Sequence, residues 1–257
     1  MSLACGILSV MGLVVPAVLP SSHNDLEEKL AFLSAIPSVD RVQIDVVDGR
    51  FATPASWPYT SSTGSPQAAS SELEAMVQKG EMLPYLDRFE YEVDLMCLDA
   101  ESAAGAWLAL GVTRLTFHAE SVTDVPRTLA SARRRYGAGT SFAPGLVSFG
   151  LALNVVSDLA LIEPCLGEVD YVQLMGIARI GRQGQPFDQR VLEKARVFHS
   201  RHPAFPLQVD GGISLENAKE LLALDVSSLV IGSALLGASD PAAAVAAFEA
   251  LESPYGV

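Results

Sequence analysis

The chain is poor in basic residues. Its 257 residues include 17 Lys and Arg against 30 Asp and Glu, which gives a formal net charge of -13. This balance argues against a surface for nucleic acid or for an anionic membrane. An anionic ligand would therefore have to be held locally, by backbone N–H groups or helix N-termini. The chain is nevertheless clearly globular, since 49% of its residues are hydrophobic and 18% are charged.

Cysteine is also scarce. Cys5, Cys97 and Cys165 are odd in number and widely spaced, which argues against a disulfide framework and favours a reducing, cytoplasmic compartment. The sequence has no CxxC motif and no paired His/Cys spacing typical of a zinc site. These absences leave a chain that holds its fold through a hydrophobic core.

The first twenty residues, MSLACGILSVMGLVVPAVLP, carry no charge. A secretory leader begins with basic residues, and this segment has none; glycines and prolines also interrupt its apolar run. We therefore interpret residues 1–13 as a short N-terminal extension packed on the barrel ahead of the first strand, in preference to a cleaved targeting segment.

The rest of the chain alternates short apolar runs with segments of helical spacing. Strands are predicted over 14–19, 41–46, 89–96, 113–117, 149–154, 170–175, 206–209 and 228–231. Helices are predicted over 24–35, 71–79, 100–110, 125–136, 158–165, 188–199, 214–224 and 242–251. This count predicts one α/β domain over 1–257, a (β/α)8 TIM barrel, which typically takes about 250 residues. An open doubly wound sheet is the alternative, but no GxGxxG motif follows the first strand.

In two segments the hydrophobic residues show neither helical nor strand spacing. Residues 51–70 are rich in Ser, Thr, Pro and Gly, and because long loops in compact domains are often functional, we expect them to form an active-site lid. Residues 137–148 are predicted to be irregular.

In a TIM barrel the active site lies at the carboxyl ends of the strands. The stretch LQVDGGI at 207–213 places Asp210 at such an end, followed by Gly211 and Gly212. Glycines in a turn expose backbone N–H groups that can hold a phosphate. The other candidate strand-end residues are Gln43, Asp45, Asp94, His118, Asn154, Met175 and Gly232.

The strand ends resemble those of a known family. The segments VPAVLPSS, QIDVVDGRF, DLMCLDAES, TFHAES, VDYVQLM with GQPF after it, VDGGISLENA and IGSALLG occur in the order found in ribulose-phosphate 3-epimerases. The resemblance covers about residues 14–250. It implies a TIM barrel that epimerises a ketopentose phosphate at C3, interconverting ribulose 5-phosphate and xylulose 5-phosphate. The implied substrate partner is thus a small sugar phosphate, and a homo-oligomer is left open.

The resemblance also implies roles for particular residues. Asp45 and Asp210 fall on the two aspartates that transfer protons on opposite faces of the sugar. The implied phosphate-binding residues are Gly181, Gly184, Gly211, Gly212, Gly232 and Ser233. The implied substrate-binding residues are Met96, His118 and Met175. Taken singly, Asp45 is equally a strand-end cap and Asp210 a turn residue; their pairing favours catalysis.

The sequence departs from the family at the metal centre. The family holds a divalent metal with two aspartates and two histidines, and the histidine positions fall on Gln43 and Asp94. Two alternatives follow. Either Gln43, Asp45, Asp94 and Asp210 form an all-oxygen site for Mg, Mn or another hard cation, or the metal is lost. In the second case clustered carboxylates would raise a pKa, and a protonated acid would take over the metal's role.

Two other functions remain open at this point. A protein that keeps the phosphate cradle without the metal centre could be a non-catalytic, phosphosugar-binding or regulatory protein. A related barrel could act on another sugar phosphate or catalyse another reaction, such as decarboxylation or aldol cleavage. No lysine stands at a predicted strand end, where it could form a Schiff base with the substrate or act as an acid. This absence weakens the hypothesis of a decarboxylase or aldolase.

Overall fold

The computed structural model describes residues 13–60, 66–137 and 147–251. The predicted N-terminal extension lies outside this range apart from Leu13, which is buried. Most of the predicted irregular segment, 138–146, also lies outside it.

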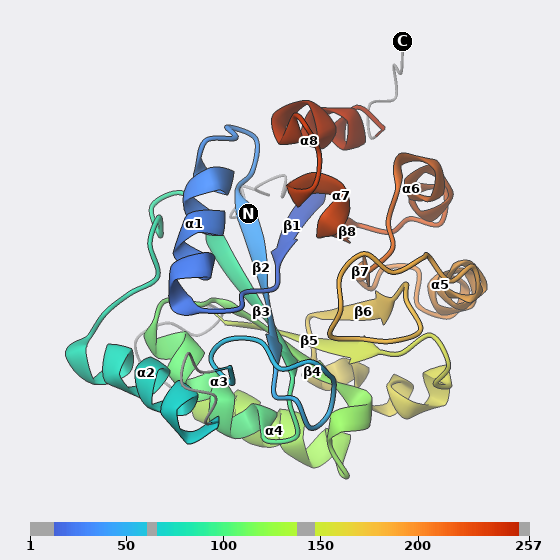
Figure 1. The fold of residues 1–257 in the computed structure, drawn as a ribbon. Coiled ribbons are helices and arrows are strands. Elements are labelled where there is room, and N and C mark those ends of the chain that lie inside the picture. Colours follow the sequence, from blue (N-terminus) through green and yellow to red (C-terminus); the bar gives the residue numbers. More distant parts are fainter. Residues whose placement is uncertain (1–12, 61–65, 138–146, 252–257) are drawn as a thin grey trace, which may run out of the picture.

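Eight parallel strands close into a barrel in sequence order (Figure 1). They are β1 (Val14–Val18), β2 (Arg41–Val47), β3 (Glu90–Met96), β4 (Arg114–His118), β5 (Ser148–Leu153), β6 (Tyr171–Met175), β7 (Leu207–Asp210) and β8 (Ser228–Ile231). Nearly every strand residue is buried, as expected for parallel strands that are covered on both faces. The prediction of a single TIM barrel is confirmed.

Helices surround the barrel on the outside (Figure 1). They are α1 (His23–Ser34), α2 (Pro66–Lys79), α3 (Ala100–Ala109), α4 (Val125–Tyr136), α5 (Arg190–Arg201), α6 (Leu215–Leu222), α7 (Ser233–Leu236) and α8 (Pro241–Glu249). Side chains cap several helix N-termini, for example Ser22 on α1, Asp124 on α4 and Ser214 on α6, because the first N–H groups of a helix lack partners within it. Among the helices in the described ranges, none is long and apolar enough to cross a membrane.

Two element predictions are corrected. The predicted loop 51–70 ends early, because α2 begins at Pro66 and not at 71; proline suits a first helical position, where its missing N–H is not needed. The helix predicted over 158–165 is instead two 3₁₀ segments, Leu159–Leu161 and Glu163–Glu168. Asp158 accepts a hydrogen bond from the Ala160 N–H, and Pro164 lacks the N–H that would continue the ladder.

The interior of the barrel is polar on several strands, although the strands look apolar overall. Glu92 is fully buried there and accepts hydrogen bonds from Arg114 Nε, Thr116 Oγ1 and Tyr171 Oη, each at 3.1 Å. Burial opposes its charge, but the Arg114 and Arg41 guanidinium groups outweigh burial and hold the pKa of Glu92 below its ordinary value. A fixed negative charge therefore lies below the carboxyl ends of the strands.

Candidate active site

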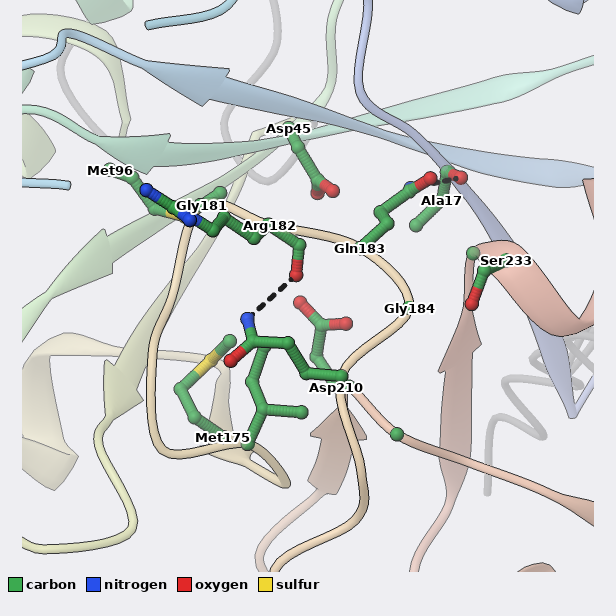
Figure 2. A pocket seen from close by; sticks show the side chains of 15 residues that line it. Ala17, Asp45, Met96, Met175, Gly181, Arg182, Gln183, Gly184, Asp210 and Ser233 are labelled. Atoms are coloured by element: carbon green, nitrogen blue, oxygen red, sulfur yellow. Dashed lines mark hydrogen bonds between the residues drawn. The ribbon is translucent and has the colours of Figure 1, made fainter. Parts of the chain in front are cut away.

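A cavity opens at the carboxyl ends of the strands (Figure 2). It holds ten of the predicted site residues, namely Asp45, Met96, Met175, Gly181, Gly184, Asp210, Gly211, Gly212, Gly232 and Ser233. Ala17, Ile177, Arg182, Gln183 and Gln185 complete its wall. The free volume is only about 40 Å³, far below the roughly 300 Å³ or more of typical small-molecule sites. Something in the wall must therefore move before a sugar phosphate can enter.

Asp45 and Asp210 reach into this cavity from β2 and β7, on either side of it in Figure 2. They are 7% and 8% exposed. Gln43 Nε2 lies between them and donates to Asp45 Oδ1 at 2.9 Å and to Asp210 Oδ2 at 3.1 Å. Two carboxylates from opposite ends of the sequence are thus tied to one amide.

Burial and the charges of neighbouring carboxylates raise the pKa of both carboxyls. Burial is the larger cause for Asp45, followed by the negative charge of Asp94, and together they raise its pKa to about 7. Burial and then the charges of Asp45 and Asp94 raise the pKa of Asp210 well above its ordinary value. Near neutral pH this pair can therefore hold a proton on one carboxyl while the other is ionised.

Asp94 on β3 and His118 at the end of β4 are fully buried. The His118 Nε2 atom is 2.8 Å from Asp94 Oδ1. Burial opposes protonation of the ring, but the Asp94 carboxylate outweighs it and raises the pKa of His118. His118 is not among the described residues that line the cavity. Its predicted contact with substrate therefore stays a prediction.

The glycine turns surround the cavity mouth. Gly211 and Gly212 follow Asp210 with φ values of 105° and 69°, a conformation that glycine adopts without strain. A Cβ on Gly212 would lie 2.6 Å from Phe187 Cα, so the earlier loop that contains Phe187 packs directly on this turn. Gly181 and Gly184 come from that same loop, between β6 and α5. The predicted phosphate turns are therefore gathered at one place.

Gln183 fills the space between these turns and was not predicted from the sequence. Its Nε2 atom donates to the Ala17 carbonyl at 3.0 Å, and Figure 2 shows the side chain between Asp45 and Ser233. A Cβ on Gly232 would lie 2.5 Å from Gln183 Nε2. The Gln183 side chain thus occupies the space beside Gly232 at the edge of the cavity.

The described part of the predicted lid is packed onto the barrel. Ser56 Oγ accepts from the Val47 N–H at 2.9 Å and donates to the Asp45 carbonyl at 3.0 Å. Trp57 is buried and meets Trp107 edge-on, with ring centroids 5.6 Å apart. Arg182 Nε donates to the Thr53 carbonyl at 2.9 Å, which joins this segment to the loop carrying Gln183. A lid role for the segment stays a prediction.

Two further glutamines that sequence reasoning missed lie below the aspartates. Gln173 on β6 and Gln208 on β7 are buried. Each stands two residues before a strand-end residue, Met175 and Asp210, and strand residues two apart share a face. In each strand, the glutamine inside an apolar run was the feature of the sequence that could have indicated a residue facing the site.

The oxygens of Asp45, Asp94 and Asp210 lie within 4.8 Å of one another, close enough for a single cation. The remaining donors do not fit such an ion. Gln43 and Gln173 turn their NH₂ groups, and not their carbonyl oxygens, toward these carboxylates. An amide NH₂ group offers hydrogen-bond donors and no lone pair for a metal.

A closed parallel barrel with paired carboxylates and glycine turns at the carboxyl ends of its strands is a typical frame for enzymes that handle phosphorylated substrates. The model of the ribulose-phosphate 3 epimerase family matches residues 73–236, and the chain belongs to this family.

Known relatives agree with this assignment. Ribulose-phosphate 3-epimerase of Mycobacterium leprae is 29% identical over 91% of this chain and 92% of its own length. The Aquifex aeolicus ribulose-phosphate 3-epimerase is 24% identical, over 90% of this chain and 92% of its own length. Among solved structures, 3-hexulose-6-phosphate synthase from Salmonella typhimurium has a TM-score of 0.60 at 17% identity, over 93% of this chain and 97% of that one. This last likeness is evidence for the fold alone.

Proposed function

We propose that the protein epimerises a ketopentose phosphate at C3, interconverting ribulose 5-phosphate and xylulose 5-phosphate. The observation that carries this proposal is the pair Asp45 and Asp210, which face one cavity from β2 and β7 with raised pKa values. Relatives named as ribulose-phosphate 3-epimerases over nine-tenths of the chain support it. The free thiols of Cys97 and Cys165, both buried, are in keeping with a reducing cytoplasm.

The proposed reaction needs one carboxylate and one carboxylic acid. The ionised aspartate removes the proton from C3, and the electron pair of the C–H bond moves to form a C2–C3 double bond as the C2 carbonyl becomes an enediolate oxygen. The protonated aspartate then returns a proton to C3 on the opposite face, and the C2 carbonyl reforms. Because the two residues exchange protonation states, turnover in the reverse direction uses the same pair.

Negative charge at the enediolate must be offset within a buried site. The protonated member of the aspartate pair can donate to the enediolate oxygen. In the same site, a protonated His118 would neutralise the charge of Asp94 and so lower repulsion of the intermediate. The N–H groups of the Gly211 and Gly212 turn are suited to the phosphate once Gln183 has moved aside.

Exchange of the C3 proton in D₂O tests the two-aspartate pathway. Asp210→Asn and Asp45→Asn should each lower epimerisation by roughly 100- to 10,000-fold. Each variant should still exchange the C3 proton of the one epimer whose proton its remaining aspartate removes. Exchange of both epimers at wild-type rates in Asp210→Asn would contradict the proposal.

A non-catalytic sugar-phosphate-binding protein is the second candidate. It is favoured by Gln43 and Asp94, which stand where the family resemblance implies histidines. Binding of ribulose 5-phosphate by calorimetry, without turnover or C3 exchange, would support it. Turnover of another sugar phosphate in a substrate panel would instead indicate a related barrel with different specificity.

A further inference from the structure

Three buried glutamines form a layer directly below the aspartates. Gln43, Gln173 and Gln208 lie on β2, β6 and β7 and are at most 2% exposed. Gln208 Nε2 donates to Gln173 Oε1 at 2.8 Å and lies 3.4 Å from Gln43 Oε1. The Gln208 NH₂ group has two hydrogens, and its two shortest contacts, to Gln173 Oε1 and to Glu92 Oε1, use both. The Gln43 carbonyl lies beside this NH₂ group at the longer distance.

The direction of these hydrogen bonds is set from below by Glu92. Its Oε1 atom accepts from Gln208 Nε2 at 2.7 Å, and a carboxylate that is paired with Arg114 Nε at 3.1 Å can only accept. If the Gln208 amide were turned over, its oxygen would face Glu92 Oε1 and two glutamine oxygens at once. Gln208 Oε1 instead has no partner among the described residues, which shows that the donor side decides its orientation.

The upper ends of the layer hold the aspartates. The side-chain carbonyl of Gln43 lies beside the Gln208 NH₂ group. Gln43 therefore points its own NH₂ group at Asp45 and Asp210. Gln173 likewise donates to Asp94 Oδ2 at 3.1 Å and to Asp210 Oδ2 at 3.3 Å. Two amide groups therefore bridge the three carboxylates pairwise, with Asp210 common to both bridges.

We propose that this glutamine layer takes the place of a divalent cation in holding the three aspartates together, and that Gln208 is the positioning residue that commits the site to a cation-independent state. To accept a cation, Gln43 and Gln173 would have to turn their oxygens upward. Their NH₂ groups would then face the NH₂ group of Gln208, donor against donor. The proposal concerns the site of the proposed function, but its main readout, cation binding, does not depend on turnover.

Titration with Mn²⁺, followed by the EPR signal of the free ion, tests the proposal on the full-length protein after treatment with EDTA. Wild type should show no stoichiometric binding. Gln208→Met keeps the side-chain length but releases both amides, so it should bind Mn²⁺ at least about tenfold more tightly, the size of effect typical of groups that orient metal ligands. A purely structural role for Gln208 would not increase affinity.

Two variants serve as controls. Gln189→Met makes the same change at an exposed residue whose side chain makes no capping bond on α5, and it should bind Mn²⁺ no better than wild type. The double variant Gln43→His/Asp94→His supplies two imidazoles and should gain a stoichiometric site.

The wild-type result decides the matter even if Gln208→Met fails to fold. One Mn²⁺ bound per chain by wild type, or a Tm that falls with EDTA and returns with Mn²⁺, would overturn the proposal. Epimerase activity abolished by EDTA would also overturn it while leaving the proposed function standing. Absence of both activity and Mn²⁺ binding would uphold the glutamine layer and reject the epimerase.

Discussion

Asp45→Asn should stabilise the protein relative to wild type, although it removes a residue of the proposed active site. The difference in free energy of unfolding should grow as the pH rises. Asp45 is 7% exposed, and its pKa of about 7 lies above the ordinary value of 3.8 for an aspartate in the unfolded chain. Between these two pH values the folded state keeps a proton that the unfolded state has lost. The stability that protonated Asp45 provides is therefore fully present below about pH 4 and is lost as the pH rises through 7.

The size of the effect follows from that interval. The pKa difference is 7 − 3.8, about 3 units, and each unit corresponds to 1.36 kcal/mol. Asparagine has the same shape and cannot ionise, and its carbonyl can keep the bond from Gln43 Nε2. We therefore expect the free energy of unfolding of Asp45→Asn to match wild type near pH 4 and to exceed it by up to about 4 kcal/mol above pH 7.

Urea unfolding in the presence of EDTA at several pH values between 4 and 8 measures this difference. Asp25→Asn is the matched control. Burial raises the pKa of Asp25, but the Lys29 ammonium and hydrogen bonds from Ser21 outweigh burial and lower it. Its contribution is therefore lost only below about pH 4, and its difference from wild type should be flat from pH 5 to 8. A flat or falling difference for Asp45→Asn would refute the assignment of a raised pKa to Asp45.

Two further predictions concern the cavity and the polar interior. Gln183→Ala removes the side chain that fills the space beside Gly232, so inorganic phosphate should bind several-fold more tightly by calorimetry; weaker binding would show that Gln183 is itself a phosphate ligand. Glu92→Leu leaves the buried Arg41 and the partly buried Arg114 without their carboxylate and should lower the free energy of unfolding by about 3–5 kcal/mol. A change below 1 kcal/mol in urea unfolding would contradict an ionised, paired Glu92.

Local pattern was sufficient to predict much of this protein. The alternation of apolar runs and helical spacing predicted the barrel, because each βα unit carries its own signal along the chain. The predicted strand ends placed Asp45 and Asp210 at the carboxyl end of the barrel, while the family resemblance supplied their implied roles and the glycine turns. These residues line one cavity, and their roles stay predictions. The helix predicted over 158–165 was wrong because Pro164 and the cap on Ala160 favour short 3₁₀ turns there.

Only the closed barrel decided what surrounds the aspartates. Gln43 bonds to Asp210 across 167 positions of sequence, and Gln208 to Glu92 across 116, so no local spacing encodes either contact. The same closure turned isolated polar residues in apolar strands into one layer, with its donors directed upward by a buried carboxylate. Gln183 stands among the predicted phosphate turns for a similar reason, because a loop crosses the barrel mouth to reach Ala17.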